Sequence, residues 1–152
     1  MEKQLRNIDD AYKWSLETVD ALRSGDFSRI DVDELVNEIG SIASGLRREL
    51  VSALRQIIEA LLVAGYTSAN DKERPENDRQ LVNAQGQVQL LLSTAPGLSA
   101  ILSEVVEEAY LDARQFVTED YRVVLPDRCP FSLERITEDP YERVVAAAGQ
   151  LA

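Results

Sequence analysis

The chain has 152 residues, the length of one typical domain, and 45% of them are hydrophobic, which supplies a core without disulfides or a structural metal. Sixteen Lys and Arg against 27 Asp and Glu give a net charge of -11, which disfavours binding to nucleic acids and to anionic membranes. The single cysteine excludes an internal disulfide, and the absence of histidine excludes Ser-His and Cys-His nucleophile pairs and the Glu-x-x-His pattern of di-iron bundles.

The start of the chain, "MEKQLRNIDD", lacks the apolar segment of a signal peptide. The longest apolar run, "IIEALLVAGY", contains Glu59 and is about half as long as a membrane span. We therefore expect a soluble, cytoplasmic protein without a membrane partner.

Two amphipathic helices are predicted in the first half of the chain. Residues 9–23 form the first, which Gly25 should end. Residues 32–64 form the second, with Asp31 as the cap, Glu34 three residues on and Gly65 as the terminator. The expected core faces are Tyr12, Leu16, Val19 and Leu22 in the first helix, and Leu35, Ile39, Ile42, Leu46, Leu50, Leu54, Ile57 and Leu61 in the second.

The second helix contains two glycines, each of which costs about 1 kcal/mol relative to alanine. Gly40 with Ser44, and Ser41 with Gly45, form overlapping pairs of small residues at four-residue spacing, here called the small-residue strip. One interpretation is a bend or break in the helix. Because the apolar stripe keeps its phase, we favour a continuous helix that packs closely on a neighbour through this strip.

Two further helices and an irregular tail are predicted in the second half. Residues 76–93 follow Pro75 and bury Leu81, Val88 and Leu91 or Leu92. Residues 97–119 bury Leu98, Leu102, Val105, Ala109 and Phe116. Residues 120–152 contain three prolines that permit only short helical pieces, at 132–136 and 141–148. The sequence therefore predicts one all-α domain, a bundle of about four main helices.

The chain resembles the domain-of-unknown-function family numbered 29, which consists of small helical bacterial proteins. The resemblance rests on "DAYKWSLETVDALRSGDFSRIDVDELVNEIGSIASGLRREL", "APGLSAILSEVVEEAYLDARQFVTE" and "LPDRCPFSLERI", which occur in the family's order and spacing. It implies an all-α bundle and carries no assigned activity.

The chain also departs from that family. Members usually have a "His-Leu-Leu-Lys-Trp" run at the end of the second helix, where this chain has Ala60 to Ala64. They also have a Ser-Trp and an arginine in the third helix, where this chain has "ENDRQL" and Gly86. Any site that the family builds from those residues is absent here, which favours a structural role.

Carboxylates are the only plentiful reactive groups. In one hypothesis, Glu104, Glu107, Glu108 and Asp112 hold Mg²⁺ for a phosphohydrolase, with Glu17 and Asp20 as a second pair. The all-α nucleoside triphosphate pyrophosphohydrolases use E-x-x-E followed by E-x-x-D, but here the order is reversed. Both pairs also lie outside the apolar stripes, which favours a solvated acidic surface.

Five other residues are candidates for a role. Glu38 is expected to form a structural ion pair with Arg48 or Arg114, and the alternative is a general base with a shifted pKa. Tyr110 and Arg114 share a helix face and are expected to form a hydrogen-bonded element at the edge of the core. Cys129 is either a thiolate or, more commonly, a packing group. Trp14 is either an anchor for a partner or a cover for another helix.

The favoured functional hypothesis is a non-enzymatic protein-interaction module, homodimeric or with another protein. Its interaction candidates are Trp14 and the small-residue strip, Gly40, Ser41, Ser44 and Gly45. The alternative is the carboxylate-based, Mg²⁺-dependent phosphohydrolase. The favoured hypothesis requires no cofactor.

Overall fold

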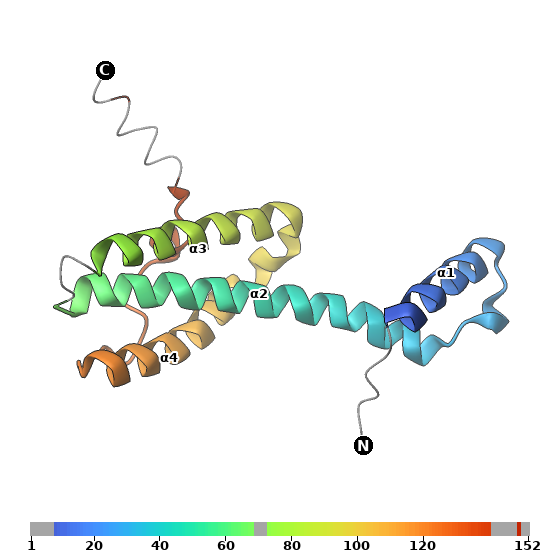
Figure 1. The fold of residues 1–152 in the computed structure, drawn as a ribbon, viewed down its shortest axis with the longest axis horizontal. Coiled ribbons are helices and arrows are strands. Elements are labelled where there is room, and N and C mark those ends of the chain that lie inside the picture. Colours follow the sequence, from blue (N-terminus) through green and yellow to red (C-terminus); the bar gives the residue numbers. More distant parts are fainter. Residues whose placement is uncertain (1–7, 69–72, 141–148, 150–152) are drawn as a thin grey trace. The chain divides into compact units, whose positions relative to one another are not determined.

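The computed structural model describes residues 8–68, 73–140 and 149, and these contain helices and no strand (Figure 1). The helices are α1 (Ile8–Ser24), η1 (Phe27–Arg29), α2 (Val32–Tyr66), α3 (Arg74–Thr94), η2 (Pro96–Ile101), α4 (Leu102–Tyr121) and α5 (Leu133–Ile136), where η marks a 3-10 helix. The all-α prediction and the long second helix are confirmed. The helical piece expected at 141–148 lies outside the described residues.

The chain divides into two compact units, residues 1–43 (unit 1) and residues 44–152 (unit 2). Unit 1 contains α1, η1 and the first turns of α2, and unit 2 contains the remaining helices. The single domain that length and composition predict stays a prediction, because the continuous helix α2 belongs to both units. Length does not show where along a continuous amphipathic helix the buried core ends.

The ends of the helices in unit 1 follow the predicted capping signals. Gly25 has a positive φ of 71°, a conformation that glycine adopts without steric cost, and it follows the last turn of α1. Asp31 accepts a 3.0 Å hydrogen bond from the backbone N–H of Glu34 at the start of α2. Arg29 of η1 contacts Asp20 of α1 at 3.2 Å, so η1 is tied to α1.

The predicted core face of α1 is wrong. Tyr12 is 68% exposed, and Leu16, Val19 and Leu22 are exposed as well. The helix instead buries Thr18 and Ala21, which lie roughly a third of the helix circumference away from the apolar stripe. Among the described residues of unit 1, no element covers the apolar stripe of α1.

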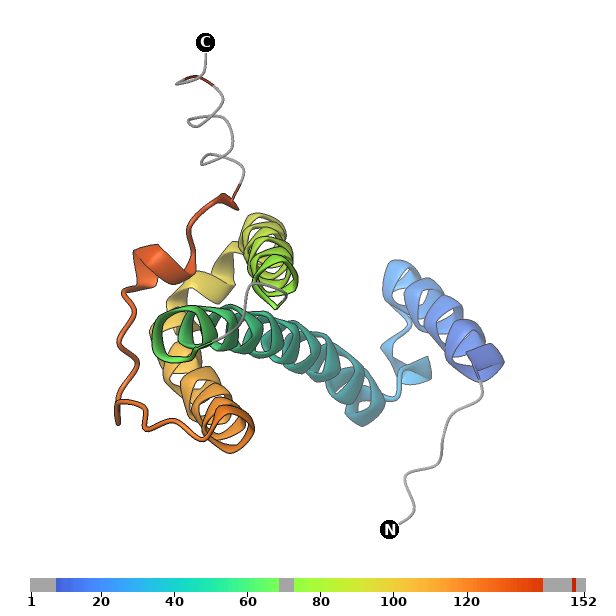
Figure 2. The same cartoon turned by 60° about the vertical axis from the view of Figure 1, so that its left-hand side comes forward.

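In unit 2, α2 lies between α3 and α4 (Figures 1 and 2). Its stripe is buried from Leu50 onward, where Leu54 and Ile57 are fully covered. Gly65 does not end the helix, which continues to Tyr66. The core combines α2 with side chains of the other helices and the tail, among them Val88, Leu91, Val105, Ala109, Tyr110, Ala113, Val117, Leu125 and Ile136.

The helix predicted at 97–119 also differs in two respects. Its first residues form the 3-10 helix η2, and the α-helix begins at Leu102. Phe116, which was expected in the core, is 46% exposed, while Tyr110 and Val117 are fully buried. The predicted burial of Val88 and Leu91 in α3 is confirmed, as is the short helix at 132–136, which Ser132 caps.

The small-residue strip does not pack against a neighbour in the described structure. A β-carbon added at Gly40 would meet no atom within 4 Å, and one added at Gly45 would only reach the Arg48 side chain at 4.0 Å. Ser41 and Ser44 are exposed. The continuity of the helix is confirmed. Close packing on a neighbour is not found at Gly40 or Gly45 among the described residues, and packing of the strip on a second copy stays a prediction.

This geometry predicts opposite effects of alanine at two glycines. Gly40→Ala should stabilise the protein by about 1 kcal/mol, because alanine has the higher helix propensity and its methyl group meets nothing. Gly25→Ala should destabilise it by about 1 kcal/mol, because φ there is positive. Denaturant unfolding monitored by circular dichroism measures both changes. A destabilising Gly40→Ala would show that a close neighbour occupies the strip.

Candidate functional site

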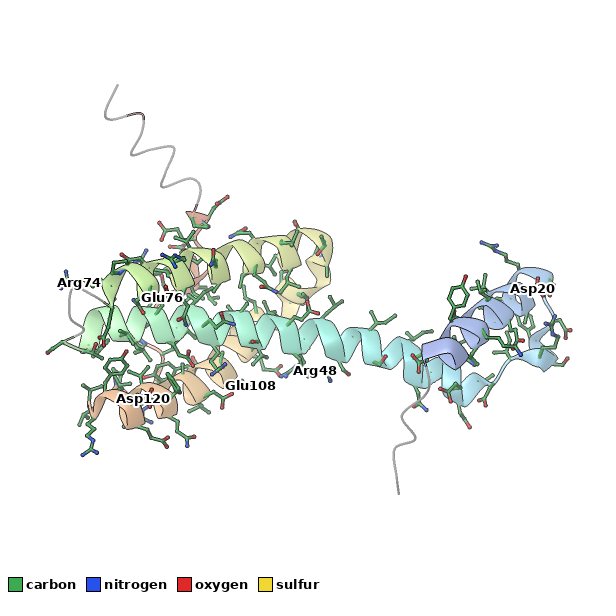
Figure 3. The ribbon with its side chains drawn as sticks, viewed as in Figure 1. Asp20, Arg48, Arg74, Glu76, Glu108 and Asp120 are labelled. Carbon is green, nitrogen blue, oxygen red and sulfur yellow. The ribbon has the colours of Figure 1, made fainter. Side chains whose placement is uncertain are left out.

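The proposed metal-binding carboxylates of α4 are engaged by an arginine of α2. Arg47 contacts Glu108 at 2.6 Å and Glu104 at 3.1 Å, and Glu108 projects from α4 on the side of α2 (Figure 3). The hydrogen bond from Arg47 lowers the pKa of Glu108. All three side chains are substantially exposed. This cluster is therefore a solvated ion-pair network between α2 and α4.

The remaining candidate carboxylates do not complete a metal site. Glu107 and Asp112 are exposed. In unit 1, Glu17 pairs with Lys13 at 3.8 Å and Asp20 pairs with Arg29. Among the described residues, no group of three or more His, Cys, Asp or Glu side chains is placed to hold a metal ion. The geometry therefore gives the phosphohydrolase hypothesis no support.

We expect millimolar Mg²⁺ or Mn²⁺ to leave the melting temperature of the protein unchanged. A ligand that binds the native state raises its stability, so a bound divalent ion would shift the midpoint upward. Differential scanning fluorimetry with Ca²⁺ as a matched control tests this. A saturable rise that Glu104→Gln and Glu108→Gln abolish would restore the metal-site hypothesis.

A second cluster ties α4 to the tail. The hydroxyl of the fully buried Tyr110 donates a 2.5 Å hydrogen bond to the carbonyl of Pro126. Arg114 contacts the Asp127 carboxylate at 2.8 Å and donates to the carbonyl of Leu125. Burial raises the pKa of Tyr110, so this phenol remains a donor at neutral pH. The predicted hydrogen-bonded role of Tyr110 and Arg114 at the core edge is confirmed, and it fixes the course of residues 125–127.

The tail is also held by α3 and by its own cysteine. Gln85 donates to the carbonyl of Arg135 at 3.3 Å, and Gln89 donates to that of Thr137. Cys129 is half-buried beside the core, and burial raises the pKa of its thiol. A protonated, packed thiol is a poor nucleophile, which favours the packing interpretation of Cys129.

Sequence reasoning missed one ionisable group in the core. Glu59 of α2 is 8% exposed and contacts Arg55 at 2.8 Å, one helical turn earlier. Burial raises the pKa of Glu59 above the usual 4.5, and the positive charge of Arg55 lowers it in part. The negative charges of Asp112 and Asp120 in α4 raise it further. The signal was present in "IIEALL", where the acid is surrounded by apolar residues.

Glu59 gives the stability of the protein a specific pH dependence. Because its pKa is higher in the folded state, the stability it contributes is complete below pH 4.5 and is lost as pH rises through the folded pKa. The free energy of unfolding of Glu59→Gln should therefore rise relative to the unmodified protein as pH increases above 4.5.

Paired denaturant titrations between about pH 4 and pH 8 measure this difference, since the other carboxylates contribute to both proteins alike. Arg55→Met should make the free energy of unfolding fall more steeply as pH rises, because Arg55 opposes the rise of the Glu59 pKa. A difference between Glu59→Gln and the unmodified protein that is constant across this range would contradict the buried-carboxylate assignment.

Unit 1 carries the largest set of exposed apolar side chains. Nine of the seventeen large hydrophobic residues that are exposed in the described structure lie between positions 12 and 42. They are Tyr12, Leu16, Val19, Leu22, Phe27, Val32, Val36, Ile39 and Ile42, and together they are named the unit 1 apolar surface. Only Thr18 and Ala21 are buried among the described side chains of this unit.

The other interaction candidates lie near this surface in sequence without forming part of it. Trp14 is half-buried on α1, and Glu38 is exposed on α2. At about 100° per residue, the centre of the small-residue strip falls on the side of α2 opposite Ile39 and Ile42, and Gly45 is the member nearest to Ile42. The structure therefore separates the apolar side chains, which a partner would cover, from the small residues that the sequence singled out.

Two depressions on the described surface of unit 2 are open to solvent. One is lined by Leu111, Arg114 and Val124, and another by Arg55, Asp112 and Phe116. Neither brings together an acid and a base in an enclosed space.

None of the described helices is by itself long and apolar enough to cross a membrane. Taken together, α3 and the segment Pro96–Tyr121 meet the length and composition criteria, but they are bent by 115°.

The comparison with known families matches residues 8–142 to DUF29, a domain of unknown function. The chain belongs to this family, so the resemblance inferred from its helix motifs is confirmed. No curated protein and no solved structure matches the chain.

Proposed function

We propose that this member of the DUF29 family is a non-enzymatic interaction module that binds protein through the unit 1 apolar surface. The observation that supports the proposal is the exposure of this surface, from Tyr12 at 68% to Val19 at 42%. Scattered single apolar residues are normal on a soluble protein, but nine within about thirty residues form a set of the kind that marks interaction sites. The helical spacing of the set matches the covered face of a packed helix.

The size of the surface is adequate for a specific complex. A large apolar side chain has about 150–200 Å² of surface, so nine that are roughly half exposed offer on the order of 800 Å², the share each partner contributes to a standard interface. At about 25 cal/mol per Å² this corresponds to about 20 kcal/mol before the costs of association, which are about 4–15 kcal/mol. The free energy gained by burying these apolar side chains can therefore exceed the cost of association.

The stability of unit 1 also favours a covering partner. Apart from the Arg29–Asp20 contact and the caps, its described residues bury only Thr18 and Ala21. Most helical stability in proteins comes from packing of an apolar face and not from intrinsic helix propensity. A partner that covers the stripe would supply that packing.

Site-specific photocrosslinking in cells tests the proposal independently of the identity of the partner. Benzoylphenylalanine in place of Ile42, which is 65% exposed, should give protein adducts. The same substitution at Ser44, which is exposed and lies about 160° around the helix from Ile42, should give about tenfold fewer if the apolar side is selectively covered.

Leu90 of α3 is the second control, because it is 62% exposed but lies in unit 2. Adducts at Ile42 that exceed those at both controls would support the proposal. Equal yields at the three positions, or none at Ile42, would contradict it.

A further inference from the structure

We propose that the protein that covers the unit 1 apolar surface is a second copy of the chain, with the two α1 helices antiparallel about a two-fold axis beside Leu16 and Glu17. The inference rests on the proposed function, since it names the partner of the same surface. Its first support is area: the exposed apolar side chains of one copy match the roughly 800 Å² that each subunit contributes to a standard interface.

The second support is the shape of the exposed stripe. A partner for unit 1 must present apolar helix faces of similar length. A second copy presents the same faces, because a two-fold interface uses the same patch on both subunits. Pairing of short helical segments around their apolar stripes is the packing principle of helical bundles. The stripe of α1 is available for this, since its buried side, at Thr18 and Ala21, points elsewhere.

The third support is the charge pattern along α1. Lys13 and Asp20 lie seven residues, or two helical turns, apart on the same flank of the stripe formed by Tyr12, Leu16 and Val19. An antiparallel pair centred beside Leu16 brings Lys13 of one copy near Asp20 of the other, and the reverse. Both side chains are more than 70% exposed, so their contacts with Glu17 and Arg29 leave them accessible.

The net negative charge of unit 1 opposes association but does not prevent the dimer from forming. Residues 11–43 contain seven acidic and three basic side chains. At physiological ionic strength, charges separated by more than about 8 Å are largely screened. The apolar contacts are short-range and unscreened, so burial of the stripe sets the affinity.

Sedimentation equilibrium of the purified full chain tests the inference between about 1 and 100 µM, the range of typical reversible association. We expect a monomer–dimer equilibrium. Leu16→Glu should weaken the affinity of the dimer on the order of 100-fold. Each of the two subunits then contributes an unpaired glutamate to the interface, because the two-fold axis repeats the substitution. Leu90→Glu, at an equally exposed leucine of unit 2, should leave it unchanged.

A charge exchange tests the antiparallel register. Lys13→Glu and Asp20→Lys should each weaken the dimer several-fold, and the double variant should restore it, because the pair is rebuilt with reversed sign. Circular dichroism monitors the fold of every variant, because Asp20→Lys also removes the contact with Arg29 that ties η1 to α1. A double variant as weak as the single ones would overturn the register.

A strict monomer at about 100 µM, or a dimer that Leu90→Glu disrupts and Leu16→Glu does not, would overturn the inference. If the purified chain is monomeric while Ile42 crosslinks to other proteins in cells, the second-copy inference fails and the proposed function stands. If the chain is monomeric and Ile42 gives no adducts, both fail.

Discussion

The structure depends on the apolar stripe of α2, a continuous helix from Val32 to Tyr66 in which only the second half is covered. Leu54 and Ile57 are fully buried in the core of unit 2, whereas Ile39 and Ile42 on the same stripe are mostly exposed. Apolar surface contributes to folding only when it leaves water. The first half of the stripe gains that contribution only where another surface covers it, and the proposed binding function would provide such a surface.

Unit 2 has the features of a stable scaffold. Its core is closed, the tail is fastened to α4 by Tyr110 and Arg114 and to α3 by Gln85 and Gln89, and Arg47 joins α2 to the acids of α4. The segments "AYLDAR" and "LPDRCPF", on which the family resemblance rests in part, meet where Tyr110 and Arg114 contact the tail. Their role in this chain is structural, because the Tyr110 hydroxyl and the Arg114 guanidinium hold carbonyls and a carboxylate of the tail. The polar groups that looked reactive in the sequence are thus used to hold elements together.

Sequence analysis located most helices because their signals are local. Gly25, Asp31 with Glu34, and the apolar spacing of α2 each act within a few residues of the element that they define. The coverage of a stripe depends on distant elements, so Tyr12 and Ile39 were expected in a core that does not reach them. The contacts of Gln85 with a tail carbonyl and of Glu59 with Arg55 also escaped prediction. A side chain that binds a remote carbonyl leaves no periodic pattern, and a single acid in an apolar run does not reveal its partner.

The central claim is that the exposed stripe of unit 1 is covered when the protein is associated. Hydrogen–deuterium exchange of the full chain at a series of protein concentrations tests it most directly, because backbone amides report local opening. We expect exchange in residues 12–22 and 33–43 to slow as concentration rises, while exchange around Leu54 and Ile57 stays constant. Exchange in unit 1 that is equally fast at every concentration would contradict the claim.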